Sequence, residues 1–544
     1  MSTPTDLAEN PPAGGTAPSK SATIRTGRAI SLVFFLGVGV RLFTLVSQAL
    51  IAAIFGTSRE MDAYTLALIV PTTIANVLSV AVGAAIIPIF IDYRENRNDT
   101  EARRLLWAVT TLGTLIALAV TSVMMAAAPW LIDLFASHVD AQTQALAATL
   151  LRFLGAIILL QGLITLFGAL LNAYDRFVAS SLLPAATAIS IVTFLLLFHQ
   201  AWGIYALAWG TLAGYALNLL LLIVACLRIG LRFRPVFDWS HPGVRRIAII
   251  ATPALMGSML VNVNILVDQF MAGFLPAGSI SSLNYAVKLV DTPSQFFYSA
   301  LYTALLPVFS LHAARRDFAS LRATFRQTVT LSALLLLPLG ALLGVLAQPI
   351  VELLYQHGKF TGASTALVAG AMALLAPSMF FVTYAFINAR AYQALQDNWT
   401  LRNVAILSLL LNGALDFLFM QFWGVAGIAF STTLTYMLTA VVLLLILDRK
   451  LQGLQLAQIA IVVGKAACAS GLIWLLCALL ERLLPIVQRY PLLQIIALSM
   501  LGLVIYPALL WVLRVRELTD LWAMIRSRLP IGRAVHQSSS RQTQ

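Results

Sequence analysis

The chain has 544 residues, of which 60% are hydrophobic and only 10% are charged, and its mean hydropathy is +0.88. A soluble protein carries about 25% charged residues, so this composition excludes a water-soluble enzyme, a disordered protein and a nucleic-acid-binding protein as default classes. The three cysteines lie alone in apolar runs, without the spacing of a disulfide framework or a zinc site. We therefore interpret the chain as a polytopic membrane protein.

The apolar runs predict an all-α membrane protein. Residues 1–28 are rich in Pro, Gly, Ser and Thr, which is typical of a disordered tail and not of a signal peptide. From residue 29 onwards, runs long enough to cross a hydrocarbon layer of ~30 Å recur, and a backbone in lipid must satisfy its own hydrogen bonds. Fourteen transmembrane helices are predicted, over residues 29–54, 63–91, 105–136, 144–171, 178–198, 202–227, 247–273, 281–309, 323–355, 364–388, 402–421, 424–447, 456–480 and 491–513.

The basic residues predict the topology. Of the 35 Lys and Arg residues, 27 fall in the tails and loops on the side of residues 1–28, here called the tail side, and 4 fall on the opposite, far side. Cytoplasmic loops carry an excess of Lys and Arg, so we expect both termini in the cytoplasm of a cell-membrane protein. The net charge of +13 then reflects loops that face an anionic leaflet, and no nucleic-acid partner is expected.

An internal repeat divides the chain. Similar strings recur 218 to 221 residues apart: 86–90 with 305–309, Ala173-Tyr174 with Ala391-Tyr392, and 203–208 with 424–429. An even number of helices returns the chain to the same side, so this spacing predicts two parallel six-helix lobes with a substrate cavity between them. The predicted parts are a tail (1–28), an N-lobe (29–228), a C-lobe (246–447), a helix pair (455–516) and a cytoplasmic tail with a membrane-surface helix (517–544).

Charged residues inside the predicted spans are costly and need a reason. Arg41 lies midway along the first span, and Lys288 and Asp291 share one face of the eighth. They either line a cavity for an anionic headgroup or, for Lys288 and Asp291, neutralise each other. Asp62 opens the second span, where a helix-capping role explains it equally well. The remaining charges near span ends, among them Asp92, Arg152 and Lys465, are expected to snorkel or to pair.

A second set of polar residues lies in spans that carry no basic residue nearby. Asp268 lies on the seventh span, Asn412 and Asp416 lie one turn apart on the eleventh, and Thr432 lies on the twelfth. Carboxylate, amide and hydroxyl oxygens are hard ligands that suit Na⁺ or Ca²⁺. The sequence therefore predicts a cation site, with a protonated carboxyl pair as the alternative.

The chain resembles the MurJ (MviN-type) lipid II flippases of the multidrug/oligosaccharidyl-lipid/polysaccharide exporter superfamily. The resemblance implies fourteen spans and a flippase, not an enzyme, that moves an undecaprenyl-pyrophosphate-linked sugar across the inner membrane by alternating access. The strings that carry the resemblance run from the first to the twelfth predicted span: Ile54-Phe55-Gly56, Met61-Asp62-Ala63-Tyr64, Asn172-Ala173-Tyr174-Asp175-Arg176-Phe177, Leu283-Asn284-Tyr285-Ala286, Tyr355-Gln356-His357-Gly358-Lys359-Phe360-Thr361, Arg390-Ala391-Tyr392-Gln393-Ala394-Leu395-Gln396-Asp397 and Gly424-Val425-Ala426-Gly427-Ile428-Ala429.

The resemblance also implies roles for particular residues. The substrate-binding positions that it implies are Arg41, Asp62, Lys288 and Asp291. The sodium ligands that it implies are Asp268, Asn412, Asp416 and Thr432, with the backbone of Ile428 as a further ligand. The chain departs from the family's pattern by having the uncharged residues Ser47, Gln48 and Ala75 at usual charge positions, and a lysine at 288 in place of an arginine. A lysine gives up the bidentate grip that arginine has on phosphate.

These observations lead to one hypothesis and three alternatives. The hypothesis is a lipid II flippase coupled to Na⁺ or to the membrane potential, acting as a monomer on a lipid-linked glycan. The first alternative is a flippase for another polyprenyl-linked oligosaccharide, which is favoured because the predicted cavity has fewer charged residues than the family pattern. A cation/drug antiporter of the same superfamily is the second alternative. A membrane-embedded glycosyltransferase or polymerase is the third, and the short loops argue against it, because such enzymes usually carry acid/base carboxylates on a sizeable extramembrane loop or domain.

Overall fold

The computed structural model describes residues 37, 39–41, 43–96, 99–174, 183–231, 234–483, 489–515 and 517, and the described residues are helical with no strand among them. The predicted tails and the predicted membrane-surface helix lie almost wholly outside these residues. The helices are α2 (Arg59–Asn96), α3 (Asp99–Ala136), α4 (Ala141–Leu154), α5 (Ala156–Ala173), α7 (Leu183–Trp202), α8 (Ile204–Arg228), α9 (Pro242–Ala272), α10 (Ser279–Ala314), α11 (Phe318–Val345), α12 (Ala347–Tyr355), α13 (Gly362–Leu375), α14 (Ser378–Ala394), α15 (Asn398–Trp423), α16 (Val425–Leu451), α17 (Leu456–Leu483) and α19 (Pro491–Val512).

Three runs that the sequence predicts as single spans are broken in the structure. Gly155 separates α4 from α5, and Leu346 separates α11 from α12. Helices α13 and α14 meet at an angle of 40°, where Pro377 precedes the first residue of α14. A proline has no N–H for the helical hydrogen bond, so a bend is expected there. Hydropathy stays high across each break, which explains why the pattern predicts one span.

Within the described residues, ten helices are long and apolar enough to cross a membrane, or eleven if the bent pair α13–α14 is one span. Three predicted spans are not among them. They are the N-terminal helix (Gly39–Phe55), α9 and α10. The fourteen-span count therefore stays a prediction, and the nearly all-helical membrane fold is confirmed.

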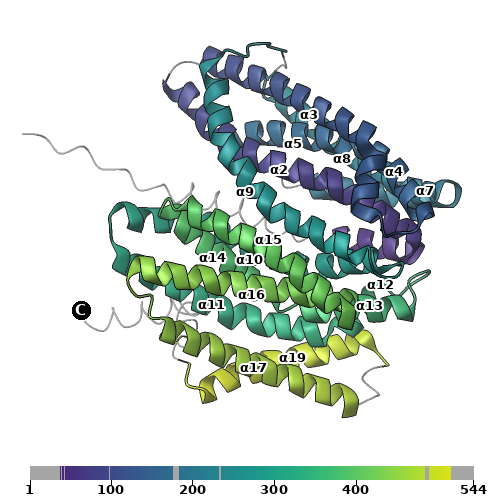
Figure 1. Ribbon diagram of the computed structural model, residues 1–544, viewed down its shortest axis with the longest axis vertical. Coiled ribbons are helices and arrows are strands. Elements are labelled where there is room, and N and C mark those ends of the chain that lie inside the picture. Colours follow the sequence, from purple (N-terminus) through teal and green to yellow (C-terminus); the bar gives the residue numbers. More distant parts are fainter. Residues whose placement is uncertain are drawn as a thin grey trace, which may run out of the picture.

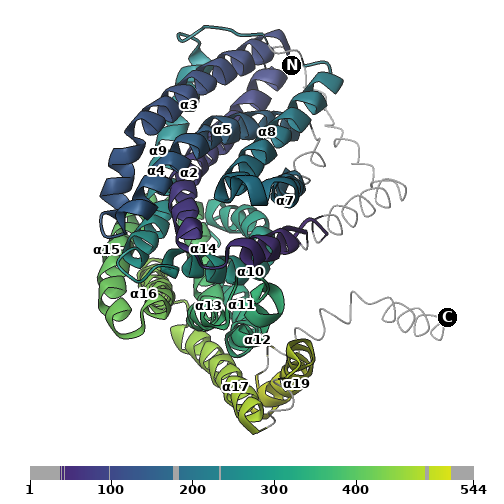
Figure 2. The ribbon, with the colours of Figure 1, turned by 90° about the vertical axis from the view of Figure 1, so that its right-hand side faces the viewer.

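The helices pack in two groups, and α9 contacts both (Figure 1). Helices α2, α3, α4, α5, α7 and α8 contact one another, and helices α10, α11, α13, α14, α15 and α16 contact one another. Helix α9 packs against α2 of the first group and α15 of the second, while α17 and α19 pack beside α11. The N-terminal helix, purple in Figure 2, runs beside α10. Helix α9, which carries Asp268, therefore links the two groups.

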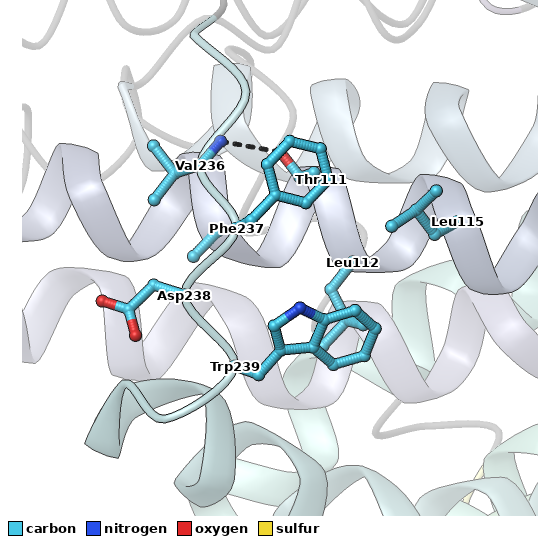
Figure 3. A pocket seen from close by; sticks show the side chains of 8 residues that line it. Thr111, Leu112, Leu115, Val236, Phe237, Asp238 and Trp239 are labelled. Carbon is cyan, nitrogen blue, oxygen red and sulfur yellow. Dashed lines mark hydrogen bonds between the residues drawn. The ribbon is translucent and has the colours of Figure 1, made fainter.

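The loop that leads into α9 fastens its tail-side end to the first group. In Figure 3 the residues before α9 lie along α3, and the Val236 amide donates to Thr111 Oγ1 at 3.2 Å. Arg104 pairs with Asp238 at 2.8 Å, and Arg246 of α9 pairs with Asp92 of α2 at 2.7 Å. The expectation that Asp92 forms a pair is thus confirmed. These contacts join the start of α9 to α2 and α3.

Candidate functional site

Four polar side chains from three helices meet where α9, α15 and α16 are in contact. Asn412 Nδ2 donates to Asp268 Oδ1 at 2.6 Å and to Asp416 Oδ2 at 3.0 Å. The Thr432 hydroxyl lies 3.2 Å from Asp268 Oδ2. The structure therefore brings together the side chains that the sequence singles out, and we call Asp268, Asn412, Asp416 and Thr432 the carboxylate cluster.

The backbone of Ile428 and one further side chain complete the carboxylate cluster. The Ile428 carbonyl oxygen lies 3.0 Å from the Thr432 hydroxyl and 2.9 Å from the Ser431 hydroxyl. Ser431 also hydrogen-bonds Asp416 Oδ1. Asp416 and Ser431 are completely buried. Sequence reasoning missed Ser431, because its contact with Asp416 joins two helices and leaves no mark in the sequence.

The donor set of the carboxylate cluster fits an alkali cation better than a transition metal. Among the described residues, no group of three or more His, Cys, Asp and Glu side chains could hold a metal ion. Two carboxylates, hydroxyls and a backbone carbonyl are oxygen donors of the kind that hard cations take. The Asn412 amide points its nitrogen at both carboxylates, so rotating the amide would present its oxygen to a cation between them.

The two predicted cavity cations lie on facing helices. Arg41 of the N-terminal helix donates from Nη1 to Gln295 Oε1 at 3.1 Å, and Lys288 of α10 donates from Nζ to Gln48 Oε1 at 2.9 Å. Among the described residues, no carboxylate lies within ion-pair distance of Lys288, so Lys288 and Asp291 do not neutralise each other. The sequence pointed to Gln48 only as an uncharged residue at a usual charge position, and it gave no reason to single out Gln295, because a neutral amide in an apolar helix attracts little notice.

Asp62 lies elsewhere and contacts a different partner from the one that we expected. It belongs to α2, is 3% exposed, and accepts hydrogen bonds from the backbone amides of Gly278 at 2.5 Å and Ser281 at 2.8 Å. These amides belong to the N-terminus of α10, where a negative charge is favourable. In this structure both carboxylate oxygens are occupied, and Asp62 joins the two helix groups. The substrate-binding role that the resemblance implies for Asp62 stays a prediction.

Close backbone contacts accompany Asp62 at the far side. The Lys359 amide donates to the Ala53 carbonyl at 2.8 Å, and the Thr57 and Ser364 hydroxyls are 2.7 Å apart. A Cβ atom added at Gly358 would lie 2.3 Å from the Ala53 carbonyl oxygen, so only a glycine permits the approach. We call this region, residues 53–62 against 278–285 and 357–364, the far-side contact. These contacts join the two helix groups at that end.

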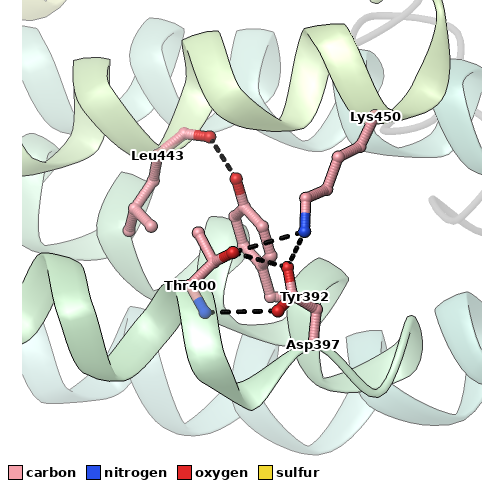
Figure 4. A network of polar contacts seen from close by, with 5 residues as sticks. All are labelled: Tyr392, Asp397, Thr400, Leu443 and Lys450. Carbon is pink, nitrogen blue, oxygen red and sulfur yellow. Dashed lines mark hydrogen bonds and ion pairs between the residues drawn. The ribbon is translucent and has the colours of Figure 1, made fainter.

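A polar network at the tail side ties α14, α15 and α16 together (Figure 4). Asp397 caps α15 through the Thr400 amide at 3.2 Å and pairs with Lys450, while the Tyr392 hydroxyl donates to the Leu443 carbonyl at 2.8 Å. Burial alone would raise the pKa of Asp397, but hydrogen bonds from Lys450 and Thr400, together with the Lys450 charge, hold the pKa below its ordinary value. The network therefore stabilises the ionised carboxylate.

We expect the Asp397→Ala variant to lose about 1 kcal/mol of stability, because the cap of α15 and the partner of Lys450 disappear together. Since the folded-state pKa is depressed, the contribution of Asp397 is present at neutral pH and is lost as the pH falls through that lowered value. Thermal unfolding in detergent at pH 7 and at pH 3 measures both effects. Equal midpoints for the native chain and the variant at pH 7 would contradict the assignment.

The fold and the two sites define a polytopic helical transporter. A family model described as lipid II flippase MurJ matches residues 51–494. The chain is 30% identical over 460 residues to a probable lipid II flippase MurJ of Synechocystis sp., covering 81% of this chain and 86% of the relative. It is 28% identical over 420 residues to the lipid II flippase MurJ of Burkholderia cenocepacia, covering 75% and 81%.

Solved structures share the fold. A lipid II flippase MurJ in an inward closed conformation superposes with a TM-score of 0.73 at 22% identity, covering 90% of this chain and 99% of that one. A multidrug resistance MATE family transporter, inward-facing, gives a TM-score of 0.63 at 14% identity, covering 77% and 98%. The chain belongs to the MurJ lipid II flippase family. It is accordingly a multi-pass inner-membrane transporter and not an enzyme.

Proposed function

We propose that this chain moves lipid II, an undecaprenyl-pyrophosphate-linked peptidoglycan precursor, from the inner to the outer leaflet. The observation that carries the proposal is the pair of cations Arg41 and Lys288 on the facing N-terminal helix and α10, in a chain of the MurJ family. A pyrophosphate is multiply anionic, and arginine and lysine side chains are the usual protein ligands of phosphate groups. The cation pair is where the headgroup binds.

Transport proceeds by alternating access between the two helix groups. The far-side contact holds them together at one end through Asp62 and the close approach of Gly358 to Ala53. A substrate taken up in this state comes from the tail side, which the distribution of Lys and Arg assigns to the cytoplasm. Release on the far side requires the Asp62 hydrogen bonds to α10 to break. The proposed functional unit is a monomer.

Sodium ions drive the cycle through the carboxylate cluster. Asp268 contributes to the cluster from α9, and the same helix carries Arg246, which pairs with Asp92 of α2. The carboxylate cluster and the Ile428 carbonyl would hold the ion, and a cation held there would fix α9 relative to α15 and α16. Because α9 also contacts the first helix group, this fixation biases the equilibrium between the two access states. A cation shifts that equilibrium only by binding one state more tightly than the other.

Complementation tests the substrate. We expect this chain to restore growth to cells depleted of their own lipid II flippase, and we expect an Arg41→Ala/Lys288→Ala double variant to fail, because the headgroup loses both cations. The control is the Arg152→Ala variant, which removes an exposed arginine remote from the cation pair. Growth supported equally by the double variant and the native chain would refute the proposed headgroup site.

A second candidate is a flippase for another polyprenyl-linked glycan. The neutral Gln48 beside Lys288 favours it, since the site carries fewer charges than the family pattern has. Ser47 and Ala75 are each 1% exposed and offer nothing to a ligand in this structure. Depletion of the protein in its own host discriminates between the two candidates: lipid II accumulates in the first case and a different lipid-linked precursor in the second. Efflux of small organic cations without any lipid precursor would identify an antiporter instead.

A further inference from the structure

The N-terminal helix and α10 lie side by side in an antiparallel register (Figure 2). Arg41 contacts Gln295, and seven residues further along, Gln48 contacts Lys288, which lies seven residues before Gln295. At the far side the Tyr285 hydroxyl donates to the Gly56 carbonyl at 3.3 Å, so α10 also contacts the residue that follows the N-terminal helix. Seven residues are two helical turns, about 10 Å. Each helix therefore carries one cation and one glutamine two turns apart, and each cation contacts the glutamine of the other helix.

Each contact joins a cation of one helix to a neutral oxygen of the other. Gln48 and Gln295 both accept through Oε1, which leaves the N–H groups of each amide for other partners. A hydrogen bond between a cation and an anionic oxygen is roughly twice as strong as one between neutral groups, and an amide oxygen lacks the full charge of a phosphate. An arriving phosphate group is thus a stronger acceptor for Lys288 than Gln48 is.

We propose that Gln48 and Gln295 are specificity-determining residues whose amide oxygens occupy Lys288 and Arg41 until the phosphate groups of the substrate displace them. This inference rests on the proposed function, since it takes the polyprenyl pyrophosphate as the ligand. Displacement removes the two cross-contacts between the N-terminal helix and α10, and the freed amides can donate their N–H groups to the same phosphate oxygens. Ligand binding and separation of the helices are then one event.

Glutamine suits this role because its oxygen is replaceable. A glutamate at position 48 would form an ion pair with Lys288, and a phosphate would then have to displace an acceptor of its own kind while facing a like charge. A methionine at the same position fills similar space but accepts only weakly. The glutamate variant is therefore expected to lower the affinity for pyrophosphate. The methionine variant is expected to raise that affinity or to leave it unchanged.

The test measures binding of inorganic pyrophosphate and of undecaprenyl pyrophosphate to the full-length chain in lipid nanodiscs. We expect Gln48→Glu and Gln295→Glu each to weaken both affinities at least tenfold, and Gln48→Met to bind as tightly as the native chain or up to about threefold more tightly. The matched control is Gln458→Glu, which adds the same charge at an exposed position of α17, and it is expected to bind like the native chain. Thermal unfolding of each variant establishes that it is folded.

The outcomes separate this inference from the proposed function. If Gln48→Glu is misfolded, Gln295→Glu decides by the same criterion. Native-like binding by the folded glutamate variants overturns the inference alone. Equal weakening by Gln48→Met and Gln48→Glu also overturns it, because the amide would then be a fixed ligand or a packing element. Absence of pyrophosphate binding to the native chain overturns the inference and the proposed function together.

Discussion

Replacing Asp416 with alanine is expected to remove the sodium dependence of transport and to slow transport at least tenfold. Asp416 is completely buried and supplies one of the two carboxylates of the carboxylate cluster. The substitution halves the negative charge available to a cation and leaves the hydroxyl of Ser431 and the amide of Asn412 without their shared acceptor. A buried polar group that loses its partner costs about 1–3 kcal/mol, so the remaining groups rearrange and do not hold an ion.

The measurement is flipping of a lipid-linked pyrophosphate in proteoliposomes with sodium or potassium in the buffer. The matched control is Asp133→Ala, which removes an exposed carboxylate from α3 and is expected to keep the native sodium response. Sodium binding measured directly on purified protein gives a readout that does not depend on transport. If the Asp416→Ala variant still transports and responds to sodium as the native chain does, Asp416 has no part in coupling.

The alternative interpretation of the carboxylate cluster predicts a different pattern. If Asp268 and Asp416 share a proton and serve only structure, Asp416→Asn keeps the hydrogen bonds to Asn412 and Ser431 and leaves transport unchanged in any salt. If the pair holds sodium, Asp416→Asn loses the sodium response as Asp416→Ala does, because an amide contributes no charge. Comparison of these two variants therefore distinguishes a coupling site from a structural pair.

The sequence predicted the members of the carboxylate cluster because a polar side chain in an apolar helix is costly enough to need a reason. The i,i+4 spacing places Asn412 and Asp416 on one face of their helix. Asp268 meets them because α9 packs against α15, which the sequence does not specify. Ser431 escaped because a serine in a helix commonly hydrogen-bonds to a carbonyl of its own preceding turn, as it does here to Ile428. Its contact with Asp416 is a matter of tertiary packing.

The partner of Asp62 could not be predicted from the sequence either. A carboxylate at the start of a helix most simply caps that helix, and Asp62 instead accepts from amides more than 200 residues away, at the start of α10. Which helix end lies next to α2 depends on how the two groups of helices meet, and periodicity carries no information about that. The predicted runs overlap the helices of the structure, and the breaks at Gly155 and Leu346 were not predictable, since the apolar pattern continues through them.

A methyl group at Gly358 is expected to open the far-side contact. The backbone of Gly358 has a φ of +58°, and a Cβ atom there would lie 2.3 Å from the Ala53 carbonyl oxygen. A left-handed backbone conformation costs a non-glycine residue about 1–2 kcal/mol, and the clash with Ala53 adds to that cost. Only the clash depends on residues 357–364 lying against residues 53–62, so the clash destabilises the closed state selectively, and a shift of at least tenfold toward the open state follows.

Access of a thiol reagent to a cysteine behind the far-side contact measures this shift. Ser282 of α10 is completely buried. The labelling background is a chain in which Cys468, the exposed native cysteine, is replaced by serine. In that chain, the cysteine of the Ser282→Cys variant reacts only when the contact opens. We expect Gly358→Ala to raise the labelling rate about tenfold over the Ser282→Cys chain alone. The same change at Gly362, where a Cβ atom would meet nothing within 4 Å, is expected to leave the rate unaltered.

Asp62→Asn should act on the same equilibrium by a different route. The substitution removes the charge that faces the N-terminus of α10 and places amide N–H groups where only acceptors fit, opposite Gly278 and Ser281. Faster labelling of Ser282→Cys in both the Gly358→Ala and the Asp62→Asn chains would identify the contact as a gate whose opening alternates with substrate uptake. If neither substitution changes the labelling rate while both proteins remain folded, the far-side contact does not limit access, and the space between the two helix groups opens elsewhere.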